Sequence, residues 1–179
     1  NSPSWTIHPV RCEDVTIDKL TIVNPFDSPN TDGIDPESCR NVRIMGCHID
    51  VGDDCIAVKA GTEDALENVP CENIAITGCT MVHGHGGVVL GSEMSGGIRR
   101  VSIAGCVFDG TDRGIRIKSR RGRGGMVEDV SVTGVVMNDV LCPLVVNLMY
   151  FCGKDGKLPI VSDPNAQPVT ERTPHVRRI

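Results

Sequence analysis

The chain has 179 residues, only 3% of them aromatic, and its 18 basic and 23 acidic side chains give a net charge of −5 at pH 7. This length suits one domain. No stretch of this sequence approaches the roughly 18 apolar residues of a transmembrane helix, and we expect no membrane partner. Val, Ile, Ala, Gly and Cys are plentiful, as the narrow core of a solenoid requires.

Short β-branched segments recur along the whole chain. Aligned with one another, they place equivalent residues at 15, 42, 74, 101 and 130, with spacings of 27, 32, 27 and 29. This period, with Gly and Asn punctuation and no helical periodicity, indicates a β-solenoid. Leucine-rich repeats share the period but need a leucine-dominated consensus that is missing here. The sequence therefore predicts an all-β fold class, a parallel β-helix, as one domain over 1–179. Its repeats lie near 12–38, 39–70, 71–97, 98–126 and 127–153, before an irregular C-terminal segment at 154–179.

Each coil also carries a second strand that can be placed in register with its neighbours. Alternate side chains of a strand face opposite ways, so the core is expected to contain Ile34, Ile56, Val88 and Ile115. Arg116 and Lys118 then point outward on one face.

Polar residues directly before this strand are expected to cluster, because successive coils lie about 4.8 Å apart. Asp32 aligns with Asp54, and Asp53 aligns with His85. Asp54 shares parity with Ile56, two residues later, so a turn or bulge must intervene, and Gly52 is the residue expected to permit it.

The nine cysteines favour packing over chemistry. Cys47, Cys79 and Cys106 occupy one repeat position, where the flanking coils have Leu20 and Val135. Free cysteine packs as a small hydrophobe, which predicts a buried ladder. An odd count without a Cys-x-x-Cys pair argues against zinc. A bridge between Cys55 and Cys79 stays open, and a reducing compartment is compatible with these thiols.

Asp32, Asp53 and Asp54 supply the groups for glycoside hydrolysis, which needs one carboxylic acid for the leaving oxygen and one carboxylate for water or carbon. In an inverting enzyme the two lie about 6.5–9.5 Å apart. Crowding is expected to raise the pKa of at least one carboxyl group.

His85 lies between glycines that leave its imidazole accessible. Each motif alone is also an ordinary turn sequence. A metal site would need the carboxylates to complete the pair formed by His83 and His85, and we predict none.

Six cations follow within eleven residues, with no acid among them: Arg113, Arg116, Lys118, Arg120, Arg121 and Arg123. Beside carboxylates, this run suggests an anionic ligand, and a uronic acid polymer fits because guanidinium can bind a carboxylate through two hydrogen bonds. A solvated loop is the alternative for Arg120, Arg121 and Arg123. Nucleic acid is disfavoured because aromatic stacking residues are nearly absent from the run.

Four motifs stand in a fixed order: Asn30-Thr31-Asp32, Gly52-Asp53-Asp54, Gly84-His85-Gly86 and Arg116-Ile117-Lys118. In this order they resemble the polygalacturonases of glycoside hydrolase family 28, over about residues 1 to 153. The resemblance implies a right-handed parallel β-helix that cleaves α-1,4-galacturonosidic bonds of galacturonan, without a cofactor, by inverting hydrolysis.

The resemblance also assigns roles to residues of this chain. Asp53 would be the general acid, Asp32 and Asp54 would activate water, and His85 would tune or orient the acid. Substrate contacts would come from Arg116, Lys118, Tyr150 and Asn30.

Family members run to roughly twice this length, so the first coils and the N-terminal cap are expected to be missing. The stretches at 91–97 and 119–125 resemble bacterial and exo-acting members. The family implies a secreted or periplasmic protein, whereas the thiols leave a cytoplasmic one open. The sequence does not predict an oligomeric state.

Two other functions remain open at this point. A pectate lyase also uses a parallel β-helix, but with calcium and an arginine base. A non-catalytic, carbohydrate-binding solenoid would have the repeat without needing these charges.

Overall fold

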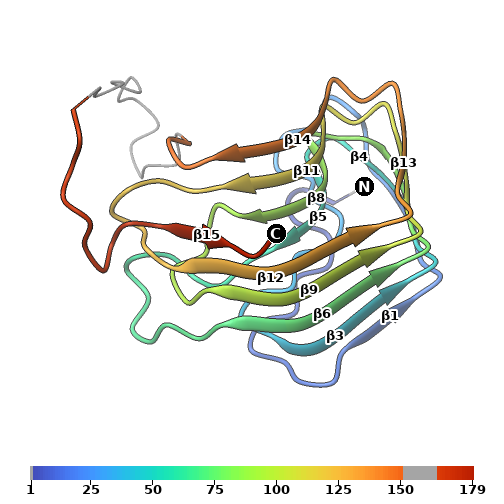
Figure 1. The fold of residues 1–179 in the computed structure, drawn as a ribbon. Coiled ribbons are helices and arrows are strands. Elements are labelled where there is room, and N and C mark those ends of the chain that lie inside the picture. The colour runs from blue at the N-terminus through green and yellow to red at the C-terminus, as the bar shows by residue number, and fades with distance from the viewer. Residues whose placement is uncertain (1, 151–164) are drawn as a thin grey trace.

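The computed structural model describes residues 2–150 and 165–179, in which the strands form three parallel sheets (Figure 1). Phe151, Cys152 and the part of the C-terminal segment at 154–164 lie outside the described residues. The largest sheet has the order β1-β3-β6-β9-β12-β15. Its strands are β1 (Thr16–Asp18), β3 (Arg40–Met45), β6 (Cys71–Thr77), β9 (Ile98–Ala104), β12 (Met126–Thr133) and β15 (His175–Arg177).

The other two sheets complete each coil. The five-stranded sheet contains β2 (Thr21–Val23), β4 (His48–Val51), β7 (Thr80–His83), β10 (Val107–Asp109) and β13 (Val136–Asn138). The four-stranded sheet contains β5 (Asp54–Val58), β8 (Gly86–Gly91), β11 (Arg113–Lys118) and β14 (Cys142–Asn147). The chain runs through one strand of each sheet and then returns to the first, so every pairing between strands is parallel and joins successive coils (Figure 1).

The predicted register is confirmed in both aligned strands. In the large sheet, Val42 pairs with Ile74, Ile74 with Val101, and Val101 with Val130. In the four-stranded sheet, the paired residues are Ile34 with Ile56, Ile56 with Val88, and Val88 with Ile115. The all-β class and the parallel β-helix are therefore confirmed. The sequence had identified two strands in each coil and missed the short strands of the middle sheet.

The core consists of stacked small and branched side chains. Ile44, Ile76 and Ile103 are fully buried, and each such side chain contributes roughly 1.5–3 kcal/mol relative to an exposed one. Phe108 is the largest fully buried side chain. It lies against Gly87, where an added Cβ would come within 3.0 Å of the ring. Aliphatic stacking between coils thus replaces the aromatic core that the composition lacks.

The cysteine ladder is confirmed. Cys47, Cys79 and Cys106 are buried free thiols, and each stands directly before a strand of the five-stranded sheet, β4, β7 or β10. Cys55 is also free, so the bridge to Cys79 that the sequence left open is not formed. These thiols act as apolar packing groups.

A ladder of left-handed residues runs along the large sheet. Its members share φ values between 54° and 59° and are Asp14, Asn41, Asn73, Arg100, Asp129 and Arg178. The Asn41 amide donates to Asp14 Oδ1 at 3.0 Å, and the Asn73 amide donates to Asn41 Oδ1 at 2.9 Å. Asn and Asp tolerate this conformation better than other non-glycine residues, which explains their recurrence at this position of the repeat.

Two expectations need correction. The change of parity between Asp54 and Ile56 does not depend on Gly52: Cys55 and Ile56 are consecutive and both belong to the buried core. A Cβ at Gly52 would instead collide with the backbone of Pro25 and Ser28, so this glycine permits close approach of a turn. The C-terminal segment, expected to be irregular, contains β15, which pairs with β12.

Among the described residues, no helix has the length and apolar character needed to cross a membrane.

Candidate active site

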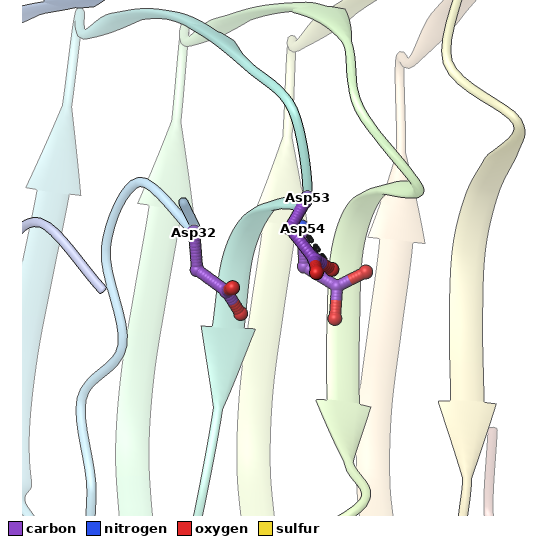
Figure 2. Close-up of side chains that lie close together, drawn as sticks. All are labelled: Asp32, Asp53 and Asp54. Atoms are coloured by element: carbon purple, nitrogen blue, oxygen red, sulfur yellow. Dashed lines mark hydrogen bonds between the residues drawn. The ribbon is translucent and has the colours of Figure 1, made fainter. Parts of the chain in front are cut away.

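Three carboxylates meet where the chain enters the four-stranded sheet. Asp32 follows β2, and Asp53 precedes Asp54, the first residue of β5. The Gly33 amide donates to the Asp54 carbonyl at 3.0 Å, which aligns Asp32 with Asp54 on adjacent coils as predicted. One oxygen from each carboxylate lies within 4.8 Å of the others. Figure 2 shows the Asp32 side chain pointing toward the other two.

Asp53 is oriented by two backbone amides. Its Oδ1 accepts from Asp54 N at 2.9 Å, and its Oδ2 accepts from Asn30 N at 3.1 Å (Figure 2 shows the first). Asn30 has a left-handed φ of 55°, which an asparagine adopts at little cost. Asn30 therefore contacts the cluster through its backbone, while the residue itself is exposed.

Arg116 and Lys118 of β11 reach the same cluster. Lys118 Nζ lies 2.6 Å from Asp54 Oδ2, and Arg116 Nη1 lies 3.7 Å from Asp54 Oδ1. The Tyr150 ring centroid is 5.1 Å from both the Arg116 Cζ and the Lys118 Nζ atoms. The two cations face away from the core as predicted, but they are largely covered and paired with a carboxylate.

Gly86 makes this contact possible. An added Cβ there would collide with Val89 and lie 3.3 Å from Asp54 Oδ1 and 3.8 Å from Arg116 Cδ. Because β8 lies between β5 and β11, a side chain at this position would separate the acid from its cation.

The pKa of Asp32 is raised to about 6. Burial is the largest cause, since it disfavours the charged form, and Asp54 and Asp53 add like-charge repulsion. Lys59 acts in the opposite direction. Asp32 thus holds its proton to higher pH than a free aspartate does, mainly through desolvation and only secondarily through crowding.

His85 has a partner that the sequence analysis missed. Its Nδ1 lies 2.9 Å from Asp112 Oδ2, and its backbone N donates to the Asp53 carbonyl at 3.1 Å. Asp112 stands 27 positions after His85, which is one coil spacing, so a signal for this pair was present in the repeat. His83, two residues before His85, forms a similar pair with Asp50 at 2.8 Å.

A buried ion-pair network lies behind Asp32. Lys59 Nζ is 3.9 Å from Asp32, 3.6 Å from Asp35 and 3.2 Å from Glu93. Arg123 continues the network, because it pairs with Glu93 at 3.2 Å and with Glu63 at 2.9 Å.

This network corrects the solvated-loop interpretation of the basic run. Arg123 is buried, and Arg120 also pairs with Glu63. Only Arg121 of the three is exposed, and it donates to the Pro168 carbonyl at 3.0 Å. Arg120 and Arg123 therefore hold the loops together by pairing with Glu63 and Glu93.

The spacing of the three carboxylates would by itself permit a bound cation. The Asp53 oxygens already accept from the Asn30 and Asp54 amides, and Asp54 Oδ2 accepts from the Lys118 ammonium group. This donor set suits an ion-paired carboxylate cluster.

Comparison with known proteins agrees with this arrangement. The model of the glycosyl hydrolases family 28 matches residues 1–170. A probable polygalacturonase of Vitis vinifera is 41% identical over 174 residues, which are 96% of this chain and 35% of that protein. An endo-polygalacturonase of Pectobacterium carotovorum is 34% identical over 175 residues, 97% of this chain and 42% of that protein.

Solved structures give the same result. The polygalacturonase from Erwinia carotovora superposes with a TM-score of 0.78 at 35% identity, covering 84% of this chain and 39% of that one. A hyperthermoactive exopolygalacturonase from Thermotoga maritima gives 0.70 at 36% identity, covering 84% and 34%. The chain thus spans well under half the length of these proteins.

Proposed function

Because the chain belongs to glycosyl hydrolase family 28, we propose that the protein hydrolyses α-1,4-galacturonosidic bonds of polygalacturonate or pectin. The observation that carries the proposal is the meeting of three carboxylates within 4.8 Å of one another beside two cations. Relatives named polygalacturonases include both endo- and exo-acting proteins, which supports galacturonan as the substrate.

In this proposal, Asp53 is the general acid that protonates the leaving oxygen. Asp32 and Asp54 together deprotonate the attacking water, which requires Asp32 in its charged form. The two amides on Asp53 fix its direction, and His85, held by Asp112, lies beside it on the next coil. Positioned acid and base groups of this kind each contribute typically 10²–10⁴-fold to rate.

Recognition of the substrate is assigned to the opposite wall of the site. Arg116 and Lys118 bind a galacturonate carboxylate, and Tyr150 packs beside both cations against the sugar ring. Asn30 adds an exposed amide at the rim. A sugar carboxylate shares Lys118 with Asp54, so substrate binding weakens the pair that holds Asp54 and changes the charge balance of the cluster.

The first test is proton NMR of oligogalacturonate with the full-length protein, which follows the anomeric signals at early times. A new reducing end of β configuration supports hydrolysis with inversion, the course that the family resemblance implies. A new reducing end of α configuration would support hydrolysis but contradict inversion. An unsaturated end that disappears on addition of chelator would replace the proposal with a lyase. Binding without any product would replace it with a carbohydrate-binding solenoid.

Exo action is the finer part of the proposal. It is supported by the segments at 91–97 and 119–125, which resemble exo-acting members, and by the likeness to the exopolygalacturonase of Thermotoga maritima. Chromatography of the products from a long oligogalacturonate tests it. Release of a single short product from the first minutes supports exo action, whereas a spread of intermediate lengths contradicts it.

A further inference from the structure

Asp35 is a buried carboxyl group that the proposed reaction does not use. Its side chain is 0% exposed, and neither oxygen has an ordinary hydrogen-bond donor within reach. It lies three residues after Asp32, near the end of the same coil, where its backbone N donates to the Ile7 carbonyl at 2.8 Å. A buried carboxylate without donors costs several kcal/mol, so this group needs either a proton or a strong counter-charge.

The available counter-charge is shared. Lys59 Nζ is the nearest cation to Asp35, at 3.6 Å, but the same atom lies nearer to Glu93, at 3.2 Å, and within 3.9 Å of Asp32. Three carboxyl groups therefore surround one ammonium group. Glu93 has a second cation in Arg123 and a hydroxyl donor in Ser92, whereas Asp35 has neither.

The electrostatics of the three acids follow this difference. Burial raises the pKa of Asp35 to about 9, while Lys59 acts against it and Asp32 and Asp54 add to it. The pKa of Glu93 is lowered to about 2, where Lys59 and its hydrogen bonds outweigh burial. At neutral pH, Asp35 is the member of the group that holds a proton, and Asp32 and Glu93 are the charged members.

We propose that Asp35, as a neutral carboxylic acid, and Lys59, as an ammonium group, are positioning residues that hold the Asp32 carboxylate in place from behind. This rests on the proposed function of Asp32. Asp35 donates its O–H to Asp32, and Lys59 supplies the charge that keeps Asp32 ionised. Trp5 covers Lys59, with its ring centroid 4.1 Å from Nζ, and so keeps water from the pair.

The kinetic test compares variants that keep or remove each function, with kcat, KM and the pH profile measured on oligogalacturonate. Asp35→Asn keeps a neutral donor of the same shape, so kcat and the acid limb of the profile stay close to those of the parent. Asp35→Leu removes the donor, and kcat falls about tenfold or more while KM changes less than threefold. Lys59→Met has the same effect and moves the acid limb to higher pH, whereas Lys59→Arg recovers most of the rate.

Glu72→Gln is the matched control, because Glu72 pairs with Arg99 and Arg100 on the large sheet, away from the carboxylates. It lowers thermal stability without moving kcat or the acid limb. If Asp35→Asn shifts the acid limb to lower pH, Asp35 was charged in the parent and the proposal is wrong. If Asp35→Leu and Lys59→Met lose stability only, as Glu72→Gln does, the positioning role is wrong.

A second measurement does not depend on activity. Carbon-13 NMR of protein labelled at the aspartate carboxyl carbons follows each group through its titration. One carboxyl signal is expected to keep the chemical shift of a protonated group through pH 7. This signal is expected to disappear in Asp35→Asn. Its absence overturns the proposal even if the protein cleaves galacturonan. Its presence in a protein that leaves galacturonan intact supports the Asp35 state and rejects the proposed function instead.

Discussion

Lys118 Nζ and Asp54 Oδ2 lie 2.6 Å apart although 64 positions separate the two residues. Asp54 begins β5 and Lys118 ends β11, with β8 between them, so the pair crosses two coil boundaries. It is almost fully buried, with the Asp54 side chain 1% exposed. A pair of this kind is held only when all three coils are in register, and it ties the proposed water-activating group to the proposed substrate-binding wall.

Replacement of Asp53 by Asn removes the proposed proton donor with little change in shape. We expect kcat to fall by about 10²–10⁴-fold with KM within about threefold, because general acid catalysis contributes in that range. Steady-state kinetics on oligogalacturonate measure both. Asp109→Asn is the control, since Asp109 is exposed and accepts a hydrogen bond from Asn138 within the five-stranded sheet, away from the site. A variant that cleaves as fast as the parent would remove Asp53 from the acid role.

The pair of His85 and Asp112 has a built-in comparison in the pair of His83 and Asp50. Both imidazoles are 54% exposed and both pairs are below 3 Å. We expect Asp112→Asn to lower kcat about tenfold, the value of one charge-assisted hydrogen bond, while Asp50→Asn leaves it unchanged. Equal effects in the two variants would show that His85 needs no fixed orientation.

The pH dependence of activity and of stability should run in opposite directions around Asp32. Because Asp32 must be charged to act on water and its pKa is about 6, kcat/KM is expected to fall about tenfold per unit below pH 6. Its folded pKa lies above the ordinary value of 3.8, so its contribution to stability is full below pH 3.8 and is lost as pH rises through 6. Denaturant unfolding at pH 4.5 and 6.5 measures this loss. A profile flat down to pH 4 would contradict the assignment.

Gly86→Ala tests the space between Asp54 and Arg116. The added Cβ collides with Val89, so we expect a loss of stability of roughly 1–3 kcal/mol together with a lower kcat. Gly78→Ala is the control, because its Cβ meets nothing within 4 Å and only the positive φ of 62° is strained. That strain costs about 1–2 kcal/mol with kcat unchanged. Calorimetry and kinetics on both variants separate the two effects.

The sequence predicted those features that recur once per coil. The register of Val42, Ile74, Val101 and Val130 could be read directly, because every coil has to bury the same position. Alignment of Asp32 with Asp54 followed from the same register. Both the fold and the clustering of the carboxylates could therefore be predicted from the sequence repeat.

Features that occur in only one coil were missed. Glu63 lies in the longest spacing between repeats and pairs with Arg120 and Arg123, and no periodicity links those positions. The parity change at Cys55 depends on where two consecutive side chains find room in the core, which a strand pattern does not contain. The short middle strands carry only three or four residues each, too few for a strand pattern to stand out from a turn.

The parallel stacking of the coils has a consequence for how the protein loses function. In a solenoid each repeat touches only its neighbours, so stability is close to a sum over individual interfaces and unfolding can begin at the weakest of them. The residues of the candidate site span every coil from Asp32 to Tyr150. Activity therefore reports the least stable interface in that span, and heat inactivation should precede loss of the β signal measured on the whole chain.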